Sequence, residues 1–242
     1  MVSARDTKKP RNTARKGPPK APRTYNSATM VARRQRILAE ALNLIEEGGV
    51  EAVTVRELSA RSEVAPRTLY AAFGSKEELV ARAVKQHFQE IMGENGATAI
   101  PDSLEAVTAR LDLLARVVLR NRQYSAAMAP IYFSSTIDRR IYEVLKEIAL
   151  SHIRPWITML VAEKRLTVST PAQVEFLLSQ LANTEYAVFN DWRNGRLGDA
   201  QLAPQLKLAA FSLIAAHAHH NALPKLNAAI SRLLRGIGPD AE

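Results

Sequence analysis

Residues 54–79 constrain the fold more than any other stretch of the chain, because they carry the start and stop signals of successive short helices. Thr54 and Ser75 each stand three residues before a glutamate, which is the spacing of a helix capping box. Pro66 suits the first position of a helix, where its missing N–H has no partner to lose. Gly74 suits a helix end, because glycine accepts the left-handed backbone that closes a helix. The pattern predicts two short helices joined by a tight turn, followed by the start of a longer one.

Helical spacing of apolar residues continues through the rest of the chain. A helix from about Ala28 should end at the Gly48–Gly49 pair. Pro155 should kink or break a later helix, and Thr170 should cap another. Aromatic residues are few and alternating apolar runs are short, so strands are not expected. The sequence predicts an all-α protein of about nine or ten helices without an internal repeat.

The net charge of +9 is concentrated at the N-terminus. Residues 1–27 contain eight basic side chains and one acidic side chain, Asp6, so they hold +7 of the total. This segment is rich in proline and poor in bulky apolar residues, and such a chain cannot bury enough surface to offset the entropy lost on ordering. We expect a disordered basic arm that is attracted to polyanions, nucleic acid first. It is either a solvated tail or an arm that contacts DNA phosphates or the minor groove.

Several classes of protein are disfavoured. The chain has no cysteine, which removes disulfide and thiolate chemistry, and it has no apolar run long enough to span a membrane. It shows no phosphate-binding glycine loop, nucleophile elbow or zinc-protease helix motif. His217 and His220 share a helix face but lack a cysteine or acidic neighbour that would complete a metal site. We expect a cytoplasmic protein that is not an enzyme and uses no metal or cofactor.

The stretch around residues 30–82 resembles the tetracycline-repressor (TetR) family of bacterial transcriptional regulators. The matching positions are Ile37, Ala41, Leu44, Gly49, Thr54, Val55, Leu58, Val64, Thr68, Leu69, Tyr70, Phe73, Ser75, Lys76, Glu77 and Leu79. Three positions depart from the family pattern. Glu63 stands where the turn usually has glycine, so the turn is either strained or built differently. Ala65 replaces a serine that would cap the next helix, and Ala72 replaces a histidine or aromatic residue.

The resemblance implies a DNA-binding domain at residues 28–82, containing a helix-turn-helix. Its second helix, at about residues 65–71, would enter the major groove of double-stranded DNA. Seven residues are candidate DNA contacts: Arg34, Thr54, Pro66, Arg67, Thr68, Tyr70 and Lys76.

These candidates have different expected roles. Arg67 is the candidate base reader, because a guanidinium pairs with guanine O6 and N7 through two hydrogen bonds. Thr54 and Lys76 stand at helix N-termini, which favour phosphate. Thr68 would meet a phosphate or a thymine methyl group, Tyr70 a phosphate, and Pro66 only apolar atoms. The structural alternatives are a plain cap for Thr54, a core ring for Tyr70, and a solvated charge for Arg67 or Arg34.

For residues 83–242 the resemblance implies a helical domain that binds a ligand and joins two subunits. The helices near residues 171–192 and 201–219 would form a four-helix bundle with a second copy, or would instead be intramolecular core. Glu185 is polar within an apolar helix, so once buried it needs a partner, and a ligand is one candidate. The candidate contacts for a small apolar or aromatic ligand are Tyr124, Met128, Tyr132, Trp156 and Glu185, with ordinary core as the alternative.

Together these expectations describe a homodimeric repressor at the bacterial nucleoid that leaves a palindromic operator when a small molecule binds. One alternative is a regulator without a small-molecule ligand. Another is a protein that compacts DNA without sequence preference through its basic tail. A steep salt dependence with little sequence preference would mark the compacting protein, whereas a protected palindromic site would mark the regulator.

Overall fold

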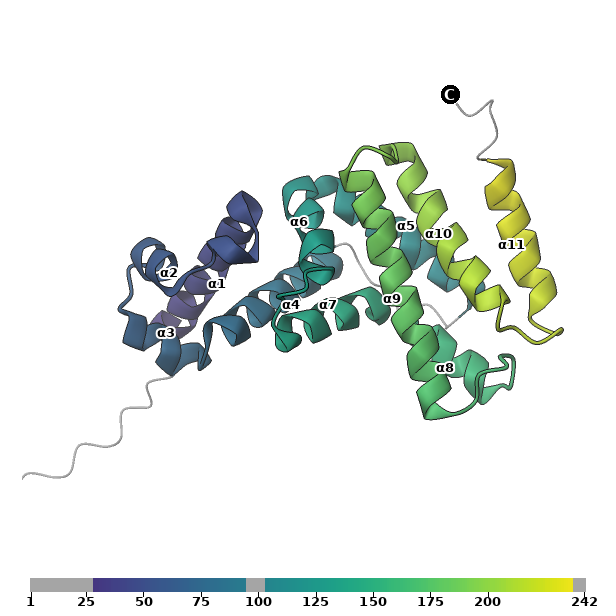
Figure 1. Ribbon diagram of the computed structural model, residues 1–242, viewed down its shortest axis with the longest axis horizontal. Helices are drawn as coiled ribbons and strands as arrows, with labels where there is room; N and C mark the ends of the chain where they lie inside the picture. Colours follow the sequence, from purple (N-terminus) through teal and green to yellow (C-terminus); the bar gives the residue numbers. More distant parts are fainter. Residues whose placement is uncertain (1–27, 95–102, 237–242) are drawn as a thin grey trace, which may run out of the picture.

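The computed structural model describes residues 28–94 and 103–236. Within them lie eleven α-helices and one 3-10 helix, with α1 to α3 at one end of the molecule and α11 near the other (Figure 1). The elements are α1 (Ala28–Gly48), η1 (Val50–Ala52), α2 (Val55–Ser62), α3 (Pro66–Phe73), α4 (Lys76–Glu94), α5 (Leu104–Arg120), α6 (Arg122–Tyr132), α7 (Arg139–Ser151), α8 (Arg154–Ala162), α9 (Pro171–Arg193), α10 (Asp199–Ala215) and α11 (Leu223–Arg235). The predicted all-α fold is confirmed. The expected basic arm at residues 1–27 lies outside the described residues.

Local hydrogen bonds set the boundaries of the first helices. The Thr54 hydroxyl accepts a bond from the N–H of Glu57 at 3.1 Å, and the Ser75 hydroxyl accepts one from the N–H of Glu78 at 3.1 Å. The N–H of Thr54 donates to the carbonyl of Ala52 at 3.0 Å, so the capping box predicted there is half made. Both predicted helix starts are nevertheless at the expected residues.

The turn between α2 and α3 is built around Glu63. Its backbone has φ 53° and ψ 45°, in the left-handed region that glycine favours. A residue with a Cβ pays about 1–2 kcal/mol for that conformation. Of the two possibilities for this turn, the strained one is observed. Ala65 offers α3 no side-chain cap, and Pro66 is the first residue of the helix.

We call α1, α2 and α3 the head. They pack around a small apolar core whose members come from all three helices. Its buried residues include Ile37, Leu38, Ala41, Leu44 and Ile45 of α1, Leu58 of α2, Leu69 and Phe73 of α3, and Val53 just before α2. Arg61 of α2 also donates two hydrogen bonds to the Glu47 carboxylate of α1, each at 2.6 Å. The head is therefore stabilised by buried apolar side chains and by a bidentate ion pair between Arg61 and Glu47.

The larger part of the molecule contains α5 to α11. α8 begins at Arg154, with Pro155 in its first turn, and is separate from α7, which helps to bring the helix count above the predicted nine or ten. The capping box at the start of α9 is complete: the Thr170 hydroxyl accepts from the N–H of Gln173 at 3.3 Å, and the Gln173 side chain accepts from the N–H of Thr170 at 3.1 Å. The sequence predicted both of these helix boundaries, from Pro155 and from Thr170.

The end of α10 differs from the prediction. The helix stops at Ala215 rather than near His219, because the next residues pair with another segment. The N–H of Thr167 donates to the His217 carbonyl at 2.8 Å, and the N–H of His219 donates to the Arg165 carbonyl at 2.8 Å. This backbone pairing joins segments about 50 residues apart, and no local sequence pattern predicts it.

The long helix α4 connects the head to the rest of the molecule (Figure 1). It packs on α1 and α3 of the head and also on α5 and α7. The domain boundary expected at residues 82–83 falls inside this continuous helix. A shift of α4 would therefore change packing contacts both in the head and in the larger helical part. None of the described helices combines the length and apolar character needed to cross a membrane.

Candidate nucleic-acid interface and an internal cavity

The short helix α3 turns one face toward solvent. Pro66 and Arg67 are exposed, Thr68 is half-buried, and Tyr70 keeps 52% of its surface accessible. The opposite face of α3 is fixed in the core of the head. Tyr70 is therefore a surface residue, and its hydroxyl is accessible to a partner.

Thr54 and Lys76 lie where helices begin, as the sequence indicated. Thr54 is exposed while its hydroxyl caps α2. Lys76 is the first residue of α4, and its Nζ lies 4.0 Å from Oε1 of Glu77, with 30% of the side chain exposed. It borders a hollow of about 250 Å³ together with Glu51 and Asp138. Its ammonium group thus faces acidic side chains of its own chain as well as solvent.

Arg34 reaches from α1 to the end of α3. Its Nη2 donates a hydrogen bond to the carbonyl of Ala72 at 3.2 Å, across 38 positions of sequence. Ala72 lies in the last turn of α3, where carbonyls lack helical partners and positive charge is favourable. The contact gives Arg34 a role in positioning α3, which sequence reasoning missed. The side chain stays exposed, so contact with a phosphate remains open to it.

A small apolar cavity lies among α4, α5, α6, α7 and α9. Its volume is about 40 Å³, little more than the space one water molecule occupies in the liquid. Three predicted ligand contacts, Tyr124, Met128 and Glu185, belong to its wall. The full lining is Phe88, Ile91, Leu114, Val117, Val118, Tyr124, Ser125, Met128, Leu145, Ile148, Glu185, Tyr186 and Phe189.

The other two predicted ligand contacts do not line this cavity. Tyr132 lies behind its wall, stacked on Tyr186 with ring centroids 4.1 Å apart, and its hydroxyl donates to Oδ1 of Asn183 at 2.7 Å. Trp156 belongs to another part of the core, where α8 meets α10. Its ring contacts that of Phe211 edge to face, with the ring centroids 6.3 Å apart. Aromatic character alone did not separate these positions, because helix packing decides which of them share a cavity.

The partner of Glu185 is His152, a residue that the sequence did not single out. Oε2 of Glu185 lies 2.8 Å from Nε2 of His152, with the two residues 9% and 4% exposed. Burial raises the pKa of the Glu185 carboxyl, and the imidazole partly opposes that effect. Nδ1 of His152 is buried without a hydrogen-bond partner among the described residues. The protein therefore supplies part of what Glu185 needs, and leaves the pair incompletely bonded.

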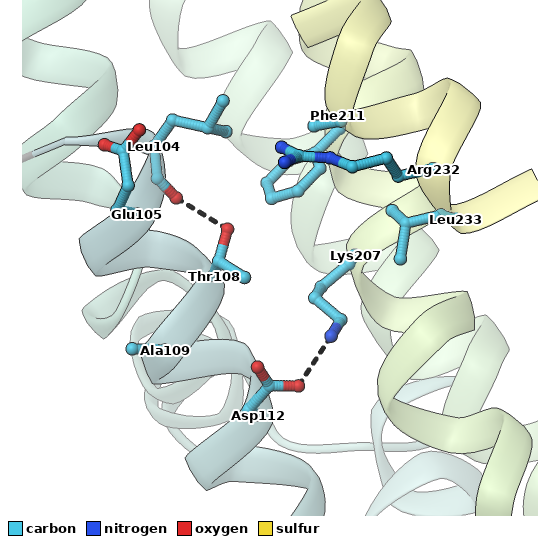
Figure 2. A pocket seen from close by; sticks show the side chains of 10 residues that line it. Leu104, Glu105, Thr108, Ala109, Asp112, Lys207, Phe211, Arg232 and Leu233 are labelled. Carbon is cyan, nitrogen blue, oxygen red and sulfur yellow. Dashed lines mark hydrogen bonds and ion pairs between the residues drawn. The ribbon is translucent and has the colours of Figure 1, made fainter. Parts of the chain in front are cut away.

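A second, more open hollow of about 380 Å³ lies between α5, α10 and α11 (Figure 2). Figure 2 shows Lys207 reaching from α10 to Asp112 of α5, with Nζ and Oδ1 2.6 Å apart. Glu105 and Arg232 also line it. None of the predicted ligand contacts borders this hollow, and its lining is more charged than that of the internal cavity.

The outer faces of α9 and α10 carry small and apolar residues. On α9, Ala172, Phe176 and Ala187 are exposed, and Phe176 keeps 60% of its surface accessible. On α10, Leu208 is only half-buried. Exposed apolar surface of this kind is a common feature of subunit interfaces.

Two short helices joined by a tight turn, carried on a larger helical body, are the arrangement found in helix-turn-helix DNA-binding proteins. Residues 37–83 match the sequence profile described as bacterial regulatory proteins, tetR family. The matched residues run from α1 into α4, so this part of the chain is similar to the TetR family.

The curated relatives are HTH-type transcriptional repressors named KstR. The chain is 34% identical over 96 residues to the protein from Rhodococcus jostii (strain RHA1). This matched stretch covers 40% of this chain and 45% of that protein. It is 31% identical over 102 residues to the protein from Mycobacterium tuberculosis, and this matched stretch covers 41% of this chain and 46% of that protein. The match thus spans less than half the length of these relatives.

Solved structures extend the likeness in fold. A TetR-family regulator from Shewanella sp. PV-4 has a TM-score of 0.58 at 20% identity, over 78% of this chain and 99% of that one. A TetR regulator from Rhodococcus sp. RHA1 has a TM-score of 0.53 at 22% identity, over 77% and 97%. RolR in complex with resorcinol has a TM-score of 0.52 at 17% identity, over 84% and 95%. At these identities the likeness concerns the fold alone.

Proposed function

We propose that this protein is a sequence-specific transcriptional repressor that binds a palindromic operator as a homodimer and leaves it when a small molecule binds. The observation that carries the proposal is the exposed face of α3. Pro66, Arg67 and Tyr70 are accessible on the second helix of a helix-turn-helix, while the other face of that helix is fixed in the head. The major groove of B-DNA is wide enough to admit such a helix.

Each exposed group has a chemical match on DNA. Arg67 would read a guanine through O6 and N7. The hydroxyl of Tyr70 and the helix N-terminus at Thr54 would contact phosphates, which fix the register of the protein without reading sequence. Lys76 would add a phosphate contact at the start of α4. Arg34 would hold α3 at the angle that this docking needs.

A single head would read too little sequence. The eight residues of α3 make about two turns, so few side chains reach base edges. Two copies would read two half-sites about 34 Å apart, or a multiple of that distance. The small and apolar outer faces of α9 and α10 support a homodimer formed through these helices, acting on DNA at the nucleoid.

The internal cavity offers a route for release. A ligand larger than its volume of about 40 Å³ must displace part of the wall. Phe88 and Ile91 of that wall belong to α4, whose other end begins directly after α3. A ligand that binds only the expanded cavity would thus favour a different position of α4 and of the head. RolR, which has a similar fold, is known in complex with the small phenol resorcinol.

The proposal is tested by selecting duplexes from a random pool with the full chain and footprinting the selected site. We expect an inverted repeat to be protected at physiological salt. Uniform binding to all duplexes, lost steeply as salt rises, would instead identify the non-specific compacting protein. A protected inverted repeat that no compound releases would identify a regulator without a small-molecule ligand.

A further inference from the structure

We infer that the ligand of the internal cavity is an apolar molecule with one hydroxyl group, and that this hydroxyl donates a hydrogen bond to Glu185. The inference rests on the proposed function, because it names the chemical class of the molecule that would release the operator. Its basis is a buried acid–base pair in the wall of an otherwise apolar cavity.

The cavity contains few polar groups, and most of these already have partners. The hydroxyl of Tyr186 donates to the Leu145 carbonyl at 3.0 Å, and that of Tyr124 lies 3.4 Å from the Val84 carbonyl that it faces. Among the described residues that line the cavity, Glu185 carries the only carboxyl group. A ligand entering this space would therefore meet hydrocarbon on nearly all sides and one strong polar group.

The carboxyl of Glu185 has fewer hydrogen bonds than it can accept. Two carboxylate oxygens offer about four acceptor positions, and His152 supplies one donor at 2.8 Å. Glu185 is only 9% exposed, so bulk water cannot complete the set. A buried carboxylate that lacks donors is costly, and a donor presented from the cavity would lower that cost.

The orphaned nitrogen of His152 indicates which partner donates. If Glu185 were protonated and donated to Nε2, the imidazole hydrogen would sit on Nδ1, which is buried without an acceptor. Buried N–H groups without acceptors are rare in proteins. With the hydrogen on Nε2, only a lone pair on Nδ1 is unused. The geometry thus favours His152 as donor and Glu185 as a carboxylate, which can only accept.

An acceptor-only group selects among ligands. A hydrocarbon leaves the carboxylate as it was, and an ether or ketone brings a second acceptor with no hydrogen to share. A ligand carboxylate adds like charge in a buried site. An ammonium group could donate, but it requires a further charge to be buried beside the imidazole. A hydroxyl donates without these costs.

The ligand-side test uses the whole unmodified chain without DNA and four probes that share an ethyl-substituted benzene ring and differ in the para group. These are para-ethylphenol, para-ethyltoluene, para-ethylanisole and para-ethylbenzoate. Their affinities are measured by calorimetry or by ligand-detected NMR. We expect the phenol to bind about 10- to 100-fold more tightly than the toluene and the anisole, the range for a hydrogen bond to a charged group. The benzoate should bind most weakly.

The protein-side test compares two variants that each remove one carboxylate. Glu185→Gln should reduce the preference for the phenol to within a few-fold. Asp112→Asn, whose side chain lies in the open hollow of Figure 2, should keep the full preference. If Glu185→Gln does not fold, the ranking of probes on the wild-type chain still decides. Equal affinities, a preferred benzoate, no saturable binding of the phenol, or an unchanged preference in folded Glu185→Gln would overturn the inference.

The outcome is separable from that of the proposed function. Operator protection combined with no preference for the hydroxyl would overturn this inference and leave the regulator standing. A strong preference for the hydroxyl combined with no operator would support the cavity chemistry and overturn the proposed regulator. Footprinting and ligand binding are therefore measured on the same preparation.

Discussion

Glu63 is held in the left-handed region at φ 53°, where a side chain is unfavourable. Glu63→Gly should raise the free energy of unfolding by about 0.5–1 kcal/mol. The relief of about 1–2 kcal/mol is partly offset by the greater freedom of glycine in the unfolded chain. Urea unfolding of the two chains measures the difference.

The matched control for that substitution is Glu57→Gly, in the first turn of α2. Glycine there occupies ordinary helical backbone, so this variant should lose about 0.5–1 kcal/mol. Opposite signs for the two variants would locate the strain at the turn. If Glu63→Gly is also less stable than the wild type, the left-handed backbone is not a source of strain.

Two exposed cations near α3 should behave differently on DNA. Arg67→Ala should change the preference at one base pair by about 1–3 kcal/mol, because it removes a base contact. Lys76→Ala should weaken binding to all sequences alike, because a phosphate contact carries no sequence information. Competition binding against single-base operator variants distinguishes them. An unchanged ranking of those variants with Arg67→Ala would remove Arg67 as a base reader.

Sequence predicted best those residues whose role depends on near neighbours. The cap at Thr54, the helix start at Pro66 and the helix end at Gly74 follow from bonds within one turn, and each is observed where predicted. The contact of Arg34 with Ala72 joins residues 38 positions apart and depends on how α1 meets α3. No spacing rule contains that information.

At the scale of helices, the same limit applies to the cavity. The sequence identified the helices that carry Tyr124, Met128 and Glu185, but it did not show which helix faces meet. It therefore grouped them with Trp156, which belongs to α8 and contacts Phe211 of α10, and it did not point to His152, which pairs with Glu185. Packing of α7 against α9 creates that pair, and packing is a property of the whole fold.

The contact between α7 and α9 should make stability depend on pH. Burial raises the pKa of Glu185 above its ordinary value of 4.5, so this carboxyl binds a proton more tightly in the folded protein than in the unfolded chain. The stability that this group contributes is present below pH 4.5 and is lost as the pH rises through its folded pKa. Relative to Glu185→Gln, the wild type should therefore lose stability in urea unfolding as the pH rises above 4.5.

Glu175→Gln is the control for that measurement, because Glu175 is exposed on the same helix and pairs with Lys146 at 2.5 Å. It should not reproduce the pH-dependent difference. A difference between wild type and Glu185→Gln that stays constant across this pH range would show that the buried carboxyl keeps an ordinary pKa.

The start of α7 is tied to the start of α4 through Arg140. Its Nη1 donates to the Ser75 hydroxyl at 3.3 Å, and its Nη2 lies 4.0 Å from the Glu77 carboxylate. If this contact transmits movement from the cavity to the head, Arg140→Ala should reduce the effect of operator DNA on the affinity for para-ethylphenol. A reduction of roughly 2- to 30-fold is the expected range for one residue in a coupled network.

Arg139→Ala is the matched control for the coupling, since Arg139 is the neighbouring arginine and is 89% exposed. Its removal should leave the mutual effect of ligand and operator unchanged. Equal coupling in both variants would mean that α4 communicates with the cavity through its apolar contacts alone.

At the scale of the molecule, most of the net positive charge lies in the N-terminal segment and not in the domain that carries the proposed DNA-reading surface. Residues 28–82 contain eight basic and eight acidic side chains, so their formal net charge is zero. Residues 1–27 carry +7. A neutral head gains little from the general attraction of phosphates, whereas the N-terminal segment gains much. Affinity and specificity should therefore be separable along the chain.

Deleting residues 1–27 should reduce the dependence of operator affinity on salt while the ranking of operator variants stays as it was. The eight basic side chains can neutralise at most eight phosphates, which sets a loss of slope of up to about 7 in log affinity against log salt. A chain of full length with those eight residues changed to glutamine separates charge from length, and it should behave like the deletion. An unaltered slope in both would show that this segment does not contact DNA, and the electrostatic part of binding would then have to come from local cations on the neutral head.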